Sequence, residues 1–412
     1  MPTEPIVIVG GGLAAAKAAE AVRERDADVG LVVVTTEPCA PYERPPLSKD
    51  YLRGQAERDT LFPLSEDWYA DQGVELRTSD TVVGLDLDAR RATLAGGAQL
   101  PFSRLLLATG SSPRMLDVPG RDLGGVQYLR TLEDSDLLAS TLLPASLEGD
   151  GRVVVVGSGW IGMEVAASAR MLGLDVTVVG LDEHPLEAVL GPEMGALYGQ
   201  VHADHEVDLR RGEVIAVVGR EGRATGVELH DGTELAADLV VVGVGATPNV
   251  GLAEAAGLPL RPRAEGGGVV VDATLRTSHP DVFAAGDIAS IPSPHYRRPL
   301  RVEHWATALE SGAHAGRALL GDDAPYDVLP YFFSDQFDVG MEYKGFVDLR
   351  SGGYEVVVSG SVSDRELVAF WLRDGAVHAG MAVNVWERMD DVEELIRSGR
   401  KFPRAELEGF TG

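Results

Sequence analysis

The sequence predicts an α/β fold, and two similar segments far apart in the chain carry that prediction. Residues 6–9 form an apolar run that leads directly into the glycines of 10–12, and the valines of 153–156 lead in the same way into 157–159. Such a run is typical of a buried strand, and the glycines allow a tight turn into a helix. Beyond Pro330 the pattern changes to alternating strand-like runs, which indicates an additional α+β domain.

Composition fits a chain of two or three globular domains. The 412 residues are 45% hydrophobic and 24% charged, and no apolar stretch is long enough to span a membrane. The first residues lack a basic region and enter a strand at once, so we expect no signal peptide and a cytoplasmic protein. A net charge of −28 argues against nucleic acid and anionic membranes as partners.

Both glycine-rich turns lie where a strand-to-helix turn binds a diphosphate, because the helix N-terminus favours an anion. One such turn is weak support, but two in the same context indicate two nucleotides held face to face, as in an oxidoreductase. After the first turn we expect a helix over 13–23 and a strand over 29–34. Glu37 follows that strand, where a carboxylate binds ribose hydroxyls, although it is also compatible with an ordinary loop position.

The proline-rich segment 41–49 predicts a stiff extended stretch that presents Arg44 and Lys49, or simply a rigid surface loop. A strand over 105–108 then ends the first part of the first nucleotide domain. In the second nucleotide domain we expect a helix over 162–172, a strand over 176–179, and a hairpin turn at Asp231-Gly232.

Later segments return to the first domain. A short strand at 282–285 ends in Gly286-Asp287, where a carboxylate can hold a cofactor hydroxyl. The helix expected from Trp305 to Leu320 carries many small residues, which predicts close packing on another backbone. We therefore predict a first nucleotide domain in two parts, 1–116 and 245–325, interrupted by a second at 117–244 and followed by a C-terminal domain at 326–412. The last domain ends in an amphipathic helix over 390–398.

Cys39 is the single cysteine, so the chain cannot form an intramolecular disulfide relay. Its Pro-rich surroundings favour a bystander over a reactive thiol. The nine histidines show no metal-ligand spacing, and we expect no metal site.

Several motifs occur in an order that resembles a known family. They are the two glycine fingerprints, the RPPLSK segment at 44–49, ATG at 108–110, TPN at 247–249, AAGD at 284–287, EHW at 303–305 and YFFSDQ at 331–336. Together they resemble the FAD-dependent ferredoxin reductases of bacterial oxygenase and cytochrome P450 systems, within the glutathione-reductase-like superfamily. The resemblance covers essentially the whole chain.

The resemblance implies two Rossmann-type domains, the FAD domain being interrupted by the NAD domain. It also implies hydride transfer from NAD(P)H to FAD and then single-electron transfer to a [2Fe-2S] ferredoxin. The cofactor-binding positions carried over are Gly10, Gly12, Leu13, Ala14, Ala15, Glu37, Arg44, Lys49, Val82, Ala108, Thr109, Gly110, Arg130, Gly157, Gly159, Trp160, Ile161, Gly162, Glu164, Asp182, Gly245, Gly286, Asp287, Trp305 and Phe333. Lys49 and Glu164 are the catalytic candidates: as a pair they either gate the nicotinamide site or form a static salt bridge.

The chain departs from the family pattern at two positions. Gly180 stands where NADH-preferring relatives often have an acidic residue, and Asp182 substitutes for it only if the loop is longer by two residues. No arginine follows this strand to bind a 2′-phosphate, which favours NADH over NADPH. Phe333 replaces a tryptophan that many relatives have beside the flavin, which keeps an aromatic wall without an indole donor.

The basic cluster of Arg297, Arg298 and Arg301 is a candidate docking surface for an acidic ferredoxin, or else a set of arginines that are solvated or paired within the C-terminal domain. Two other functions stay open. One is a reductase of rubredoxin or of a small acceptor such as a quinone or monodehydroascorbate. The other is a flavoprotein similar to apoptosis-inducing factor, whose nucleotide binding governs association. The sequence leaves a monomer and a homodimer open.

Overall fold

The computed structural model describes residues 4–148 and 151–410, so the expectation for the first residues of the chain lies partly outside the described part. The chain divides into two compact units. The first holds the chain up to residue 43 with 58–112 and 247–330; the second holds 44–57, 113–246 and 331 onward. The chain passes from one unit to the other five times, and two of these passages lie within β8 (Ser111–Pro113) and β17 (Ala246–Pro248).

The first unit is built on a parallel sheet in the order β19-β7-β1-β2-β3. Its strands are β1 (Ile6–Val9), β2 (Leu31–Val34), β3 (Val74–Arg77), β7 (Arg104–Leu107) and β19 (Val282–Ala284). All residues of β1 and β2 are buried, as expected for parallel strands that are covered on both faces.

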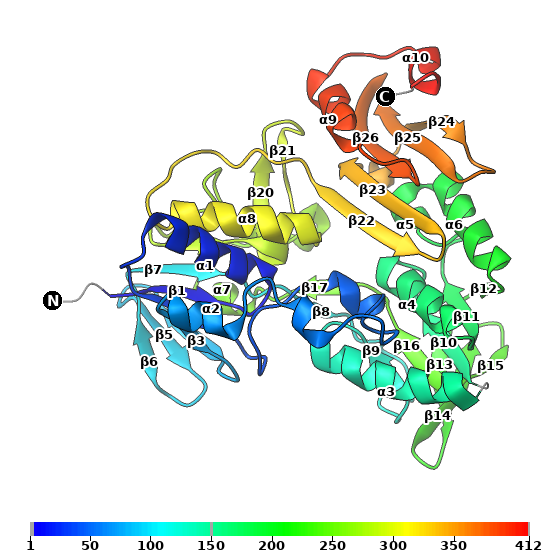
Figure 1. The fold of residues 1–412 in the computed structure, drawn as a ribbon, viewed down its shortest axis with the longest axis horizontal. Coiled ribbons are helices and arrows are strands. Elements are labelled where there is room, and N and C mark those ends of the chain that lie inside the picture. The colour runs from blue at the N-terminus through cyan, green and yellow to red at the C-terminus, as the bar shows by residue number, and fades with distance from the viewer. Residues whose placement is uncertain (1–3, 149–150, 411–412) are drawn as a thin grey trace. The chain divides into compact units, whose positions relative to one another are not determined.

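Two helices of the first unit, α1 (Leu13–Arg25) and α8 (Trp305–Ala318), pack side by side (Figure 1). A Cβ atom at Gly312 would lie 2.4 Å from the carbonyl oxygen of Ala14, and one at Gly316 would lie 2.5 Å from that of Ala18. The predicted close packing of the small-residue helix is therefore confirmed.

Smaller elements complete the first unit. They are η2 (Arg58–Leu61), α2 (Glu66–Asp71), the antiparallel set β4 (Val82–Asp86), β5 (Arg91–Leu94) and β6 (Gln99–Pro101), then α7 (Gly251–Ala255), η3 (Arg263–Glu265), β18 (Val269–Val270), η4 (Gly286–Ile288), β20 (Ala289–Ser293) and β21 (Arg298–Leu300).

The second unit contains another parallel sheet, in the order β12-β11-β10-β16-β9. Its strands are β9 (Val126–Tyr128), β10 (Arg152–Val156), β11 (Asp175–Gly180), β12 (Asp208–Arg211) and β16 (Leu239–Val242). Its helices are α3 (Leu132–Glu148), α4 (Trp160–Met171), α5 (Glu187–Leu190) and α6 (Pro192–Asp204), and an antiparallel set comprises β13 (Val214–Arg220), β14 (Arg223–Leu229) and β15 (Glu234–Ala236). The turn predicted at Asp231-Gly232 joins β14 to β15, which confirms it.

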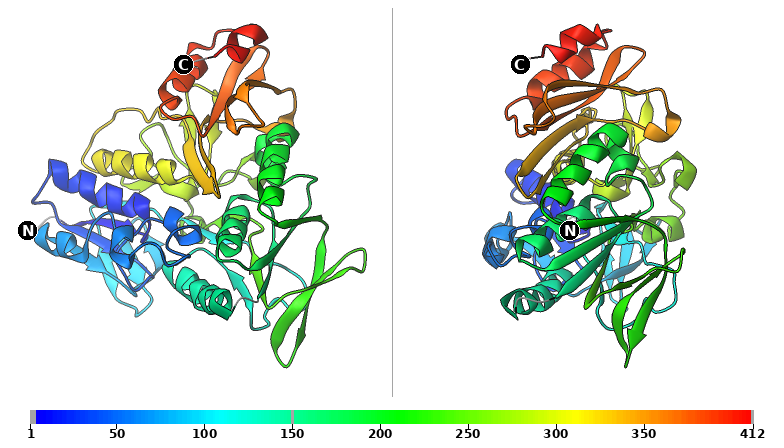
Figure 2. Two further views of the ribbon diagram at one scale, coloured as in Figure 1. Left: turned by 45° about the vertical axis from the view of Figure 1, so that its right-hand side comes forward. Right: turned by 90° about the vertical axis from the view of Figure 1, so that its right-hand side faces the viewer.

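The C-terminal part of the second unit is an antiparallel sheet in the order β22-β23-β26-β25-β24. It comprises β22 (Tyr331–Gln336), β23 (Val339–Gly345), η5 (Leu349–Ser351), β24 (Glu355–Ser361), β25 (Glu366–Arg373), β26 (Ala376–Val383), α9 (Met389–Ser398) and α10 (Arg404–Glu408). Helix α9 packs on β23 and β26, and Figure 2 shows it in red against the orange strands. No helix in the described ranges is both long enough and apolar enough to cross a membrane.

One local prediction is wrong. The segment 41–49 is not extended throughout, because Pro45–Ser48 forms the 3₁₀ turn η1. Its hydrogen bonds run from Leu47 N to Arg44 O and from Lys49 N to Pro46 O. Prolines at the first positions of a helical turn lose no needed hydrogen bond, and their fixed φ suits the turn.

Candidate functional site

The first glycine-rich turn joins β1 to α1 and cannot accept a side chain at its first position. Gly10 has φ +138°, and a Cβ atom there would lie 2.0 Å from the carbonyl oxygen of Ala108. Its N–H donates to Val34 O at 2.9 Å, which fixes the turn at the carboxyl end of the sheet. Helix α1 then begins at Leu13, so its free N–H groups face the space above the turn.

Elements from the end of the first unit meet the start of α1, which follows this turn. Gly286 (φ +70°) donates its N–H to Ser311 Oγ at 2.9 Å, and a Cβ there would lie 3.3 Å from the Cβ of Ala14. Asp287 follows in η4 and is buried. Burial lowers the pKa of His304 to about 4, although the Asp287 carboxylate acts in the opposite direction, so a neutral imidazole precedes α8.

Glu37 lies three residues after the end of β2. Its carboxylate accepts a hydrogen bond from the hydroxyl of Tyr42. Tyr42 is fully buried, so this donor is fixed. In the same unit, Asn249 joins the residues after β7: its Nδ2 donates to Thr109 O at 2.9 Å, and Thr109 Oγ1 donates to Asn249 O at 2.7 Å. The TPN and ATG motifs therefore support each other directly.

The second glycine-rich turn joins β10 to α4. Gly157 has φ +110°, and a Cβ there would lie 2.4 Å from Gly243 O; a Cβ at Gly162 would lie 2.1 Å from Gly157 O. A Cβ at Gly159, in contrast, would meet no atom within 4 Å. The turn is therefore closely packed on its inner side and open on the side where a diphosphate would approach.

Lys49 and Glu164 form a buried ion pair in the second unit. Lys49 Nζ lies 2.8 Å from Glu164 Oε1, and the two side chains are 11% and 8% exposed. Lys49 Nζ also donates to Pro45 O at 3.2 Å, and Ser48 Oγ donates to Glu164 Oε2. Because the carboxylate has several donors, burial of the pair does not leave an uncompensated charge.

Neighbouring helices hold η1 in place for this ion pair. Ser168 Oγ on α4 donates to Ser48 O at 2.6 Å, and Ser135 Oγ on α3 donates to Leu47 O at 2.9 Å. Lys49 is thus presented by a short turn whose carbonyl groups are fixed on two sides.

Strand β22 contributes to the same region from the C-terminal sheet. Ser334 Oγ donates to Glu164 Oε1 at 2.7 Å. Phe333 points to the other face of the strand, and Lys49 Nζ lies 5.9 Å from its ring centroid. Trp160, the first residue of α4, makes edge contacts with Phe332 at 5.0 Å and Tyr198 at 5.8 Å between ring centroids.

The predicted site residues are distributed over the two units. The first unit contains Gly10, Gly12, Leu13, Ala14, Ala15, Glu37, Val82, Ala108, Thr109, Gly110, Gly286, Asp287 and Trp305. The second unit contains Arg44, Lys49, Arg130, Gly157, Gly159, Trp160, Ile161, Gly162, Glu164, Asp182, Gly245 and Phe333. Within their own units, the start of α1 meets Gly286, and Lys49 meets Glu164.

Sequence reasoning gave no role to several residues that contact the site. Ser48 and Ser334 lie within motifs that were recognised, yet their hydrogen bonds to Glu164 join segments more than a hundred residues apart. Tyr42 was likewise visible in a motif without its link to Glu37.

The three arginines of the predicted docking cluster differ in environment. Arg297 and Arg298 are exposed on the β20–β21 hairpin. Arg301 is only 16% exposed, donates to Gly266 O and Asp287 O, and pairs with Glu303 at 2.6 Å. Arg301 is therefore held by residues of the first unit, whereas the alternative interpretation expected its partners in the C-terminal domain. Within the described residues, no group of three or more His, Cys, Asp or Glu side chains is placed to hold a metal ion.

Residues 4–312 match the family described as pyridine nucleotide-disulphide oxidoreductase, and residues 331–409 match a reductase C-terminal domain. The chain belongs to this oxidoreductase family. The predicted family and fold class are thereby confirmed, and membership implies FAD and NAD(P)H as cofactors.

Relatives of this oxidoreductase match it over nearly its whole length. It is 36% identical to the ferredoxin–NAD(+) reductase component of the anthranilate 1,2-dioxygenase system of Burkholderia cepacia, over 97% of this chain and 95% of the relative. It is 36% identical to rhodocoxin reductase of Rhodococcus erythropolis, over 87% and 81% of the two chains. The crystal structure of the covalent putidaredoxin reductase–putidaredoxin complex matches with a TM-score of 0.91 and 32% identity, over 99% and 96% of the chains.

The residues present fit both nucleotides. The turn of Gly10 leaves no room for a side chain on its inner side, and α1 follows it directly, as a diphosphate site requires. The open side of Gly159 and the start of α4 at Trp160 fit a second diphosphate in the other unit. Glu37, with its fixed tyrosine donor, fits a ribose.

Proposed function

We propose that this oxidoreductase transfers electrons from NADH to a [2Fe-2S] ferredoxin that supplies an oxygenase or a cytochrome P450. The observation that carries the proposal is the cysteine count within a disulphide-oxidoreductase fold. The chain matches that family, yet Cys39 is its only cysteine and is buried. No intramolecular disulfide can take electrons from the flavin, so an external acceptor must, and the ferredoxin reductases among the relatives favour a ferredoxin.

The chain's own residues bind and orient the cofactors in this proposal. FAD, when bound, supplies the conversion from two-electron to one-electron transfer. The turn of Gly10, Gly12 and Leu13–Ala15 binds its diphosphate, and Glu37 binds a ribose. Gly157–Gly162 binds the diphosphate of the nicotinamide nucleotide in the second unit. The remaining predicted site residues keep the roles that the family resemblance implies. We also propose the predicted division into two nucleotide domains, of which the first is in two segments, and a C-terminal domain.

Lys49 and Glu164 are the proposed catalytic pair. Their buried ion pair holds the ammonium group in one place, and the Phe333 ring lies near it. We propose that this arrangement keeps water away from the flavin and nicotinamide rings and orients the nicotinamide when it enters.

We propose NADH as the preferred donor. Asp182 lies two residues beyond Gly180, and no arginine follows β11 before the next helix. Arg211 on the adjacent strand is already engaged, since it donates to Leu181 O at 3.2 Å and lies 3.6 Å from Glu183. A carboxylate without a free guanidinium disfavours a 2′-phosphate.

We place ferredoxin docking at Arg297 and Arg298 and leave Arg301 out. Serine at both exposed positions should raise the apparent KM for ferredoxin about tenfold and leave reduction of a small artificial acceptor unchanged. Arg220→Ser, on an 83% exposed arginine of the β13–β14 hairpin, is the matched control. An unchanged KM for ferredoxin would remove this docking surface.

The deciding experiment is anaerobic titration of the purified holoprotein with NADH, followed by addition of a bacterial [2Fe-2S] ferredoxin. We expect the flavin absorbance to bleach with NADH and to recover as ferredoxin is reduced. Rapid oxidation by a quinone or monodehydroascorbate but not by ferredoxin would favour a small-acceptor reductase. Slow turnover with every acceptor, together with a change in oligomeric state on NADH addition, would favour the non-enzymatic alternative.

A further inference from the structure

A chain of hydrogen bonds leads from Glu164 away from the ion pair and ends at a buried histidine. Ser334 Oγ donates to Glu164 Oε1 at 2.7 Å, and Gln336 Nε2 donates to Ser334 Oγ at 3.1 Å. At its far end, Gln336 Oε1 lies 2.8 Å from His202 Nε2. Ser334 and Gln336 are two residues apart on β22 and so share one face, whereas His202 lies on α6.

The direction of every hydrogen in this chain follows from the carboxylate. An ionised glutamate only accepts, so the Ser334 hydroxyl must donate to it and can only accept from Gln336. The Gln336 amide group then directs its NH₂ toward Ser334 and its oxygen toward His202. His202 must therefore carry its proton on Nε2. The four side chains are almost fully buried, so water does not substitute for any member.

His202 acts in this chain as a neutral donor. Burial lowers its pKa to about 4, although the hydrogen bond with Gln336 acts in the opposite direction, and the nearby His205 adds to the lowering. Within the described residues, His202 Nδ1 has no hydrogen-bond partner. The Phe337 ring covers the imidazole edge at 5.0 Å between centroids.

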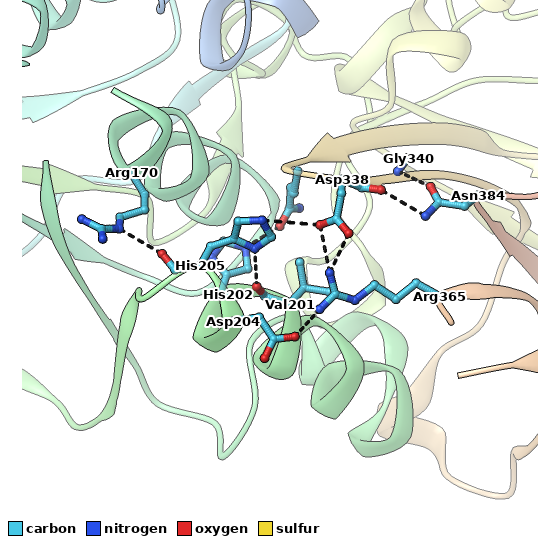
Figure 3. Close-up of polar contacts among 10 residues, drawn as sticks. Arg170, Val201, His202, Asp204, His205, Asp338, Gly340, Arg365 and Asn384 are labelled. Carbon is cyan, nitrogen blue, oxygen red and sulfur yellow. Dashed lines mark hydrogen bonds and ion pairs between the residues drawn. The ribbon is translucent and has the colours of Figure 1, made fainter. Parts of the chain in front are cut away.

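A second set of contacts fixes the hairpin that carries Gln336. Phe337 and Asp338 form the tip between β22 and β23, and Asp338 pairs with Arg365, which also pairs with Asp204 at the end of α6 (Figure 3). Asn384 donates to Asp338 O at 3.0 Å and accepts from Gly340 N at 2.9 Å. The tip therefore cannot shift along α6 without breaking several contacts.

We propose that Gln336 and His202 are positioning residues for Glu164, and that their one-way hydrogen-bond chain holds the Ser334 hydroxyl on the carboxylate that pairs with Lys49. Neither residue touches a cofactor site described above; both act through Ser334. The tests that measure flavin reduction by NADH rest on the proposed function, whereas the test of the hydrogen-bond chain itself does not.

The first test is independent of activity. Long-range ¹H–¹⁵N correlation spectra of the holoprotein labelled on histidine nitrogen report the tautomer, and the missing peak in His202→Gln assigns His202. We expect a neutral ring with the proton on Nε2 from about pH 6 to pH 8, because burial lowers the pKa of His202 to about 4. An unperturbed histidine, which titrates near 6.5, would change its charge within this range. A proton on Nδ1, or an imidazolium in this range, would overturn the proposal.

The second test reverses the polarity of the chain. In Gln336→Glu the new carboxylate can only accept, so it competes with Glu164 for the Ser334 hydroxyl. We expect anaerobic flavin reduction by NADH to slow by roughly tenfold, a loss of about 1.4 kcal/mol, with flavin content retained. Gln99→Glu, at an exposed position of β6, adds the same charge and is the control.

Two further variants separate positioning from packing. His202→Leu should slow reduction, whereas His202→Gln, which keeps an N–H donor, should recover most of the rate. In a Ser334→Ala background, Gln336→Glu should have no additional effect, because the chain is already interrupted. Additive losses, or no recovery with glutamine, would contradict the proposal. If the wild-type flavin does not react with NADH, the proposed function fails, while the tautomer test still decides the hydrogen-bond chain.

Discussion

The two glycine-rich turns of this oxidoreductase have the same backbone arrangement, but a different element supplies the side chain that lies between each turn and the adjacent strand. Gly10 N donates to Val34 O at 2.9 Å, and Gly157 N donates to Val179 O at 2.8 Å. These bonds make Gly11 and Ser158 counterparts in the turn. On the adjacent strand, the residues that follow the two valines are Thr35 and Gly180.

Each turn leaves room for one side chain between turn and strand. A Cβ at Gly11 would lie 1.9 Å from Thr35 Oγ1, and a Cβ at Gly180 would lie 2.4 Å from Ser158 Oγ. In the first unit the strand supplies the side chain; in the second unit the turn supplies it. Whether a side chain fits at position 180 therefore depends on the residue at position 158. The nucleotide preference cannot be inferred from position 180 alone.

The largest expected effect distinguishes the two turns by what each one binds. Gly10→Ala places a Cβ 2.0 Å from Ala108 O, and Gly157→Ala places one 2.4 Å from Gly243 O, both at positive φ. We expect the first variant to retain less than about a tenth of the wild-type flavin, because the turn backbone must move. The second should keep its flavin and lose its response to NADH.

Flavin content after purification and the NADH titration measure both effects. Gly97→Ala is the control, because Gly97 also has positive φ but faces open space. If Gly10→Ala kept its flavin, or if both variants lost it equally, the assignment of one nucleotide to each turn would be wrong.

The next effect concerns the exchanged side chain. Gly180→Glu alone should be poorly tolerated because Ser158 occupies the space, whereas Ser158→Gly combined with Gly180→Glu should fold. The new carboxylate would then accept ribose hydroxyls and repel a 2′-phosphate. We expect the double variant to favour NAD⁺ over NADP⁺ by about tenfold more than wild type, measured by calorimetry. Ser158→Gly alone should leave the ratio unchanged, and an equal gain from Gly180→Glu alone would show that the two positions are independent.

Much of the fold was predictable because its main elements are local. The apolar runs of β1 and β10, the small-residue helix α8 and the amphipathic helix α9 each occur where their patterns indicate, within two residues at most ends. The turn η1 was missed because prolines suit both an extended segment and a first helical turn. The partners of Glu164 were missed for another reason. Ser48, Ser334 and, through Gln336, His202 come from three distant segments, and no local pattern reports which side chains tertiary packing brings together.

The smallest effects come from the carboxylates beyond the two strands, Glu37 and Asp182, which lie at equivalent positions in the register. Glu37 accepts a hydrogen bond from buried Tyr42, whereas Asp182 is not supported by a corresponding tyrosine in the described hydrogen bonds. Tyr42→Phe should therefore weaken FAD binding by about fivefold, the effect of one lost hydrogen bond worth about 1 kcal/mol. Asp182→Asn should shift the preference between NAD⁺ and NADP⁺ by only about twofold to threefold, because an exposed carboxylate is screened by solvent. Dissociation constants from flavin fluorescence and calorimetry give both values. A larger effect at Asp182 than at Tyr42 would mean that the second turn relies on its acidic residue more than the first, and the exchange between Ser158 and Gly180 would then not explain the difference between the two sites.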